Sequence, residues 1–174
     1  MKFRLHRINW NLAAGLLLAS LVGGCATNSK VDENLATIRL HVEVNPLVVR
    51  RSMEVSVLRA HPVKLTVAED EVLHEGNLDK AEISTDGGTH SIRLTFDDSG
   101  RRMLVASSAA NLGKRVAVVA QFPDLRWLAA PMITKINTNG VFTFTPDADL
   151  EECRRLVDGL TIVIEKRKKE DWLK

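Results

Sequence analysis

The residues in this chain best suited to metal binding are its histidines and their acidic neighbours. His41 and Glu43 fall on the same side of an alternating segment, where a strand would present both side chains together. Three further histidines, His61, His74 and His90, lie in separate turn-like stretches without the spacing of a metal site. We therefore expect surface or turn histidines and no bound metal.

Nucleophilic catalysis is equally weakly supported by the sequence. Cys153 would be reactive only if exposed beside a base, and its spacing from Leu150 and Val157 places it on the buried stripe of a helix. Ser107 and Ser108 lack the Gly-x-Ser-x-Gly turn that exposes a catalytic serine. We expect a protein that is not an enzyme and holds no cofactor. A small metal-dependent or cysteine-dependent envelope enzyme is the alternative.

The first 25 residues combine a basic start, an apolar run over residues 12–22, and the small residues of Gly23-Gly24-Cys25. As a helix the run would reach about 17 Å, well short of a hydrocarbon core about 30 Å thick, so a permanent membrane span is not expected. The segment resembles a bacterial lipoprotein signal with its lipobox. Ordinary secretory cleavage is the alternative.

The resemblance to lipoproteins implies cleavage before Cys25 and covalent lipid on its sulfur as the only attached group. A lipid anchor would hold the protein on a membrane of the bacterial cell envelope. Ala26 follows the cysteine, and by the sorting pattern of lipoproteins this favours the outer membrane, facing the periplasm, in a cell with two membranes.

Charge and length limit what the rest of the chain can be. The chain has 24 basic residues, of which three lie in residues 1–24, and 22 acidic ones, so the mature protein is nearly neutral. That balance gives no argument for nucleic-acid binding. We expect a signal peptide over residues 1–24, a lipidated cysteine and flexible linker over 25–34, one domain over 35–164, and a charged tail over 165–174.

The elements expected in the domain come from alternation, turn residues and helix caps. The first strand, near residues 38–44, should have one face exposed to water, whereas residues 116–120 read as a strand covered on both faces. The other expected strands cover residues 53–57, 63–67, 81–84, 91–96, 132–136, 141–145 and 161–164. The expected helices run from residue 97 or 98 to about 112, and from about 147 to Gly159.

Two turns carry hairpin signals, because glycine accepts the positive φ that tight turns need. Asp86-Gly87-Gly88 should join the strands on either side of it, and Asn137-Thr138-Asn139-Gly140 should join residues 132–136 to residues 141–145. The pattern as a whole predicts an α+β fold, with a mostly antiparallel sheet and two helices packed on one face.

Several stretches together resemble a known family. They are Ser91-Ile92-Arg93-Leu94-Thr95-Phe96, Asn111-Leu112-Gly113-Lys114-Arg115-Val116, Ala130-Pro131-Met132-Ile133, Phe142-Thr143-Phe144-Thr145 and Glu151-Glu152-Cys153-Arg154. In order and spacing they resemble the head subdomain in the first periplasmic domain of the SecD/SecDF export subunit, over about residues 63–160. The resemblance implies a head-like module, proposed in that family to engage extended polypeptide.

The sequence departs from the SecD pattern in two ways. It lacks the multiple membrane helices of the export motor after the signal, and residues 121–127 stand where the family usually has an Asp-Gly turn, so the loop there is changed. Phe122 and Trp127 in that loop are candidate partner contacts. Asn111 and Lys114 recur in the family, where a helix stop explains them and a contact role is the second reading.

Trp172 in the charged tail either packs on the domain or helps a partner dock. The basic run over residues 166–169 is interrupted by acids on both sides and indicates a solvated helix or tail, with contact to anionic lipid or another envelope polyanion as the alternative. The sequence thus predicts a lipid-anchored envelope lipoprotein with a protein-binding, non-catalytic domain, acting as an adaptor or accessory subunit of an envelope complex. A purely structural lipoprotein is the remaining alternative.

Overall fold

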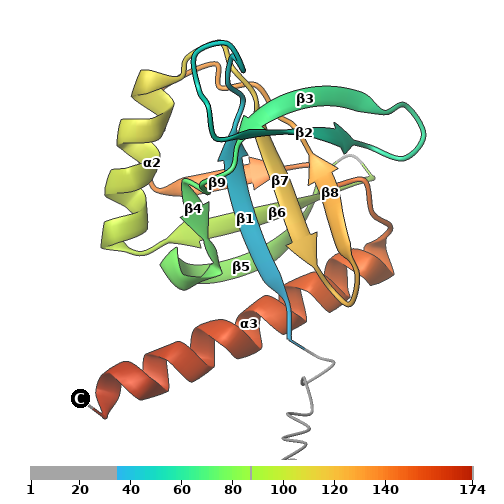
Figure 1. The fold of residues 1–174 in the computed structure, drawn as a ribbon. Coiled ribbons are helices and arrows are strands. Elements are labelled where there is room, and N and C mark those ends of the chain that lie inside the picture. Colours follow the sequence, from blue (N-terminus) through green and yellow to red (C-terminus); the bar gives the residue numbers. More distant parts are fainter. Residues whose placement is uncertain (1–34, 87, 174) are drawn as a thin grey trace, which may run out of the picture. The chain divides into compact units, whose positions relative to one another are not determined.

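A four-stranded antiparallel sheet forms the middle of the domain in the computed structural model, which describes residues 35–173 except residue 87. Its strands are β1 (Thr37–Val42), β4 (Leu73–His74), β7 (Val116–Gln121) and β8 (Leu125–Ala129), in the order β4-β1-β7-β8 (Figure 1). All residues of β7 except the last are buried. The expectation that this strand is covered on both faces is confirmed.

The hairpin of β2 (Ser52–Val57) and β3 (Val63–Ala68) covers the second face of the central sheet. Its alternating valines and leucine form a small core of their own with Ala117 of β7. Because of this cover, the prediction that one face of β1 is exposed to water is wrong at His41. The ring is only 4% exposed, and its Nδ1 lies 2.9 Å from the carbonyl oxygen of Ala68 in the hairpin.

A second sheet has the order β5-β6-β9, from β5 (Leu78–Asp86), β6 (Thr89–Phe96) and β9 (Val141–Phe144). The hairpin expected at residues 86–88 is confirmed, and Gly88 adopts a φ of 83° in its turn. The expected sheet is divided into three, and every strand pairing among the described residues is antiparallel. The α+β class with mostly antiparallel strands is confirmed.

Helix α2 (Asp98–Ala110) begins as expected. Its N-cap Asp97 accepts a hydrogen bond of 2.8 Å from the Gly100 amide, which satisfies one of the free N–H groups of the first turn. A short 3₁₀ helix, η2 (Glu75–Asn77), was not expected from the sequence. The imidazole of His74 accepts the hydrogen bond that caps it, so this turn histidine has a local structural role.

Helix α3 (Leu150–Trp172) is longer than the sequence suggested (Figure 1). Its N-cap is Asp149, two residues after the expected start, and Glu152 completes a capping box. The predicted helix end at Gly159 is wrong, as is the strand at residues 161–164. Gly159 is buried and the apolar stripe continues to Ile164, so burial outweighs the weak helix propensity of glycine.

The basic residues near the end of α3 hold the helix to β5. Arg167 donates a hydrogen bond to the carbonyl of Leu78 and pairs with the Asp97 carboxylate at 3.2 Å. Lys168 pairs with Asp79 at 2.7 Å. Residues 165–172, expected as a solvated helix or tail, are helical and partly tied to the domain.

The main core lies between the two larger sheets and the two helices. Its fully buried members come mainly from β1, β4, β5, β6, β7, β8 and α3, and the largest are Ile38, Leu40, Leu73, Leu78, Ile92, Leu94, Leu128, Leu156, Leu160 and Val118. No helix among the described residues is long and apolar enough to cross a membrane.

Candidate functional site

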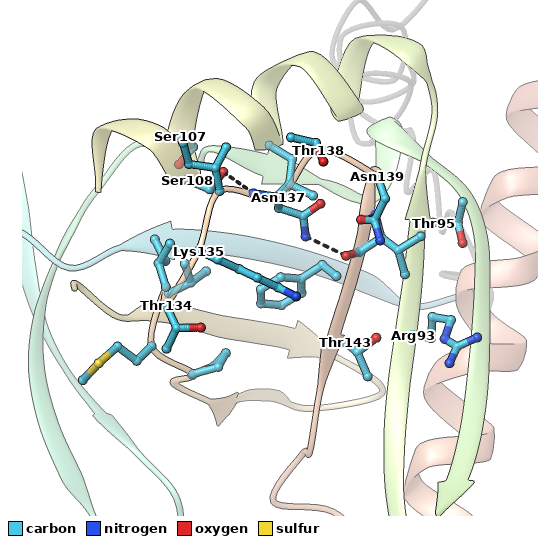
Figure 2. A pocket seen from close by; sticks show the side chains of 18 of the residues that line it. Arg93, Thr95, Ser107, Ser108, Thr134, Lys135, Asn137, Thr138, Asn139 and Thr143 are labelled. Carbon is cyan, nitrogen blue, oxygen red and sulfur yellow. Dashed lines mark hydrogen bonds between the residues drawn. The ribbon is translucent and has the colours of Figure 1, made fainter. Parts of the chain in front are cut away.

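A groove of about 900 Å³ lies beside strand β9 (Figure 2). Its walls are helix α2, the segment of residues 131–139, and the strands β6 and β9. The polar side chains that line it are Glu82, Arg93, Thr95, Ser107, Ser108, Thr134, Lys135, Asn137, Thr138, Asn139 and Thr143. This lining combines neutral hydrogen-bonding groups with three charges, which suits a polar or main-chain ligand more than an apolar one.

The groove exists because the second expected hairpin does not form. β9 pairs with β6, whereas residues 131–133 pair on their other side with residues 114–116. The amide of Val116 donates to the Pro131 carbonyl at 2.9 Å, and the amide of Ile133 donates to the Lys114 carbonyl at 2.8 Å. The predicted strand at 132–136 and its pairing with β9 are therefore wrong. The two arms diverge and leave the groove between them.

The turn that joins the arms is fixed by asparagine side chains. Asn137 donates from Nδ2 to the Val141 carbonyl at 2.7 Å, and Asn139 accepts from the Val141 amide at 3.0 Å. Ser108 of α2 accepts from the Asn137 amide at 2.9 Å and holds the turn against the helix (Figure 2). Side chains that bond to nearby main chain in this way compete with a hairpin ladder.

Gly140 closes the turn and permits close contact with α2. Its φ is 72°, and a Cβ built on it would lie 2.9 Å from Cγ of Arg101. A larger residue here would strain the backbone and displace the Arg101 stem. Glycine is thus required for the chain to reach β9 along the helix.

The charged side chains at the groove differ in whether they have an ion-pair partner. Glu82 is paired with Lys80 at 2.8 Å, and this hydrogen bond holds the pKa of the Glu82 carboxyl below its ordinary value. Arg93 lies opposite Glu82 in the sheet, and the exposed Lys135 points into the space between the arms (Figure 2). Because Glu82 is already paired with Lys80, the two cations Arg93 and Lys135 give the groove a net positive charge.

Asn111 and Lys114 form a local cap at the end of α2. Asn111 donates from Nδ2 to the Ser107 carbonyl at 2.9 Å, and its Oδ1 accepts from Nζ of Lys114 at 2.9 Å. Gly113 follows with a φ of 81°. This is the helix stop expected from the sequence, and a partner contact by the exposed Lys114 side chain stays a prediction.

The stretch expected as a docking loop is a hairpin. β8 pairs with β7, so the sequence analysis missed a strand in residues 125–129. Phe122 is only 5% exposed and lies in the main core, with the Arg126 guanidinium 5.8 Å above its ring. Trp127 packs edge-on against His41, their ring centroids 5.5 Å apart. Both aromatic rings therefore stabilise the fold. Their proposed partner contacts stay predictions, and a partner could reach only the part of each residue that is still exposed.

Trp172 is the most exposed of the predicted contact residues. It lies at the end of α3 with 93% of its surface accessible, and Leu173 beside it is 87% exposed. A shallow hollow beside them is lined by Glu165, Lys168 and Lys169. Packing of Trp172 on the domain is excluded by this exposure, whereas its role in docking stays a prediction.

The candidate metal-ligating residues Glu43 and His90 have local hydrogen-bond partners. Glu43 accepts a hydrogen bond from the Arg115 amide at 2.9 Å, and His90 contacts Thr85. Among the residues that the structure describes, no three His, Cys, Asp or Glu side chains gather as a metal site would require.

Cys153 is completely buried, as its helical spacing predicted. Burial raises the pKa of its thiol, and the nearby carboxylates of Asp149 and Glu152 raise it further. The thiolate that nucleophilic chemistry needs is therefore disfavoured at this position. Cys25, the predicted lipid attachment site, lies outside the described residues.

Comparison with known proteins identifies the fold. No protein-family model matches the sequence, and no curated protein sequence matches it. A structure of SecDF, described as a membrane component that enhances protein export, matches with a TM-score of 0.56 and 16% identity, covering 91% of this chain and 70% of that one.

A crystal structure of SecDF in a super-membrane-facing form matches with a TM-score of 0.53 and 18% identity. It covers 72% of this chain and 18% of the SecDF chain. At such identities the likeness establishes the fold alone. The SecD-like fold implied by the sequence motifs is thus confirmed.

Proposed function

We propose that this chain is a lipid-anchored lipoprotein of the bacterial cell envelope whose non-catalytic domain binds polypeptide, as an adaptor or accessory subunit of an envelope complex. The observation that carries the proposal is the SecDF-like fold over 91% of the chain, together with a polar groove beside an edge strand. The matched SecDF protein enhances protein export, so unfolded or extended polypeptide is the ligand class that this likeness favours.

The N-terminal residues support the envelope location. A basic start, a short apolar run and Gly23-Gly24-Cys25 are typical of a lipoprotein signal. Lipid on Cys25 would hold the domain on the membrane, and a linker of residues 26–34 would let it reach about 30 Å away. Binding without catalysis is supported by the buried, poorly ionised Cys153, and by the finding that no three His, Cys, Asp or Glu side chains gather as a metal site among the described residues.

Site-specific crosslinking tests polypeptide binding. A photo-crosslinking residue replaces the exposed Thr134 in the groove of the full-length protein, and a matched one replaces the exposed Ser56 on β2. Each is exposed to a permanently unfolded, carboxymethylated reporter protein and to the same reporter in its folded form. We expect the unfolded reporter to be captured from Thr134 and not from Ser56. Equal capture at both positions, or none, would contradict the proposed function.

Fractionation tests the anchor. In cells, the unmodified protein should sediment with membranes, whereas the Cys25→Ser variant should lose its lipid and most of its membrane association. The mass of the mature protein gives an independent measurement, because it should begin at Cys25 and carry acyl chains. A mature protein with a free Cys25 thiol would show that the anchor is not lipid.

A further inference from the structure

We propose that the groove receives an extended polypeptide segment as an added β-strand, between the open edge of β9 and the arm of residues 131–136. The inference rests on the proposed polypeptide-binding function and adds the mode of binding and the ligand chemistry. Two main-chain edges, one on each side of the groove, carry it.

The first edge belongs to β9. In an antiparallel pair, main-chain groups point alternately toward the partner strand and away from it. The Phe96 amide donates to the Gly140 carbonyl, whereas both main-chain groups of Val141 bind the side chains of Asn137 and Asn139. Two residues further on, the N–H and C=O of Thr143 therefore also point away from β6. Within the described residues, these two main-chain groups of Thr143 face the groove and make no hydrogen bond to β6.

The second edge belongs to the opposite arm. Pro131 and Ile133 direct their main-chain hydrogen bonds to residues 113–116. By the same alternation, the N–H and C=O of Met132 between them point away from that strand, on the side of the groove. An extended segment lying between the arms would find donors and acceptors on both of its own edges.

The outer edges of β4, β5 and β8 are less accessible to a ligand. β4 has only two residues, and the carbonyls at the start of β5 accept hydrogen bonds from Arg167 and Lys168. On β8, the Leu128 carbonyl accepts from the Asp147 amide at 2.8 Å. Short or covered edges are the usual protection against unwanted pairing, and the centre of β9 lacks it.

The side chains around the groove indicate which segments would fit. In an added strand, alternate side chains would face Phe142 and the buried Leu104, while the others would face Thr143 and Arg93. The positive charges of Lys135 and Arg93 favour an acidic residue among the side chains that face Thr143 and Arg93. The ligand is thus an extended segment that alternates apolar and polar residues and carries a carboxylate.

Peptide binding to the full-length protein tests strand addition. The probe is an acetylated and amidated seven-residue peptide of alternating valine and threonine with glutamate at its centre. Thr143→Ala keeps the main-chain donor and should bind the peptide like the unmodified protein. Thr143→Pro removes the donor without removing a ladder hydrogen bond, and should weaken binding at least about fivefold. Amide chemical shifts should change at Thr143 and Met132 on peptide addition.

A second measurement leaves the protein unchanged, in case Thr143→Pro does not fold. Methylation of the central main-chain nitrogens of the peptide should weaken binding by at least about fivefold per lost hydrogen bond. Lys135→Glu should weaken the binding of the glutamate peptide and strengthen the binding of a peptide with lysine at its centre.

The outcomes separate this inference from the proposed function. If methylated and unmethylated peptides bind equally while the unfolded reporter still crosslinks at Thr134, strand addition is wrong and polypeptide binding stands. If the reporter is not captured at all, the proposed function fails first. If the amide shifts cluster on β5 and not on β9, the site is overturned.

Discussion

The two turns that the sequence marks as hairpins differ in one respect, which is whether their arms pair. Residues 86–88 join β5 and β6, and the ladder between these strands runs from Asp86 opposite Thr89 to Leu78 opposite Phe96. Residues 137–140 reverse the chain equally well, but β9 pairs with β6 and the other arm with residues 114–116. A turn signal therefore fixes a reversal, whereas competing partners decide the pairing.

The strongest test of this comparison removes one large side chain from each arm. Ile92 is fully buried in the closed hairpin, so Ile92→Ala should lower the free energy of unfolding by about 2–5 kcal/mol. Ile136 in the open arm is 46% exposed, and Ile136→Ala should cost less than about 1 kcal/mol. Urea unfolding measures both. Similar losses would mean that the open arm packs as tightly as the closed one.

A smaller effect is expected where the open turn is held to α2. Ser108→Ala removes the acceptor of the Asn137 amide and should cost about 1–2 kcal/mol, because the amide is left without its partner. The neighbouring Ser107→Ala is the matched control and should change stability by less than about 0.5 kcal/mol. Amide exchange at Asn137 should accelerate in the first variant only. Unchanged exchange would show that Ser108 does not keep the arms apart.

The smallest effect concerns the junction where β9 leads into α3. Burial would raise the pKa of Glu152, but the hydrogen bond from the Asp149 amide and the contact with Arg126 hold it below the ordinary value of 4.5. Ionised Glu152 thus stabilises the fold above pH 4.5, and this contribution is lost as the pH falls through the lower folded pKa.

Glu152→Gln should flatten the acid limb of a stability curve by less than about 1 kcal/mol. The exposed Glu151, paired with Arg155, provides the control, and Glu151→Gln should leave the curve nearly unchanged. An identical acid limb in all three proteins would show that ionised Glu152 does not stabilise this junction.

Most of the elements could be predicted from local sequence, because their signals are local. Alternation placed β2, β3 and β6, and Asp97 placed the start of α2. Two errors have a common cause in tertiary burial. Gly159 would end an isolated helix, yet α3 continues because its stripe is buried against β5. The alternation predicts that His41 is exposed to water, yet the β2-β3 hairpin covers it.

The groove was beyond the reach of sequence analysis for a different reason. Asn137, Asn139 and Gly140 were noticed as turn residues, and the first two act instead on the main chain of Val141. Ser107 and Ser108 were considered only as nucleophiles, although Ser108 anchors the turn. Asparagines spaced by two before a strand are the one local signal that would have suggested a capped, open edge.

By itself, the sequence determined the antiparallel α+β character, the buried stripe of α3, and the lipoprotein-like start, because periodicity, capping and charge order are properties of neighbouring residues. Only the tertiary structure decided which strands pair, that Phe122 is buried and Trp127 packs against His41, and that the edge of β9 faces a groove. Strand pairing depends on hydrogen-bonding partners distant in the chain, and their competition is settled only when the whole core is assembled.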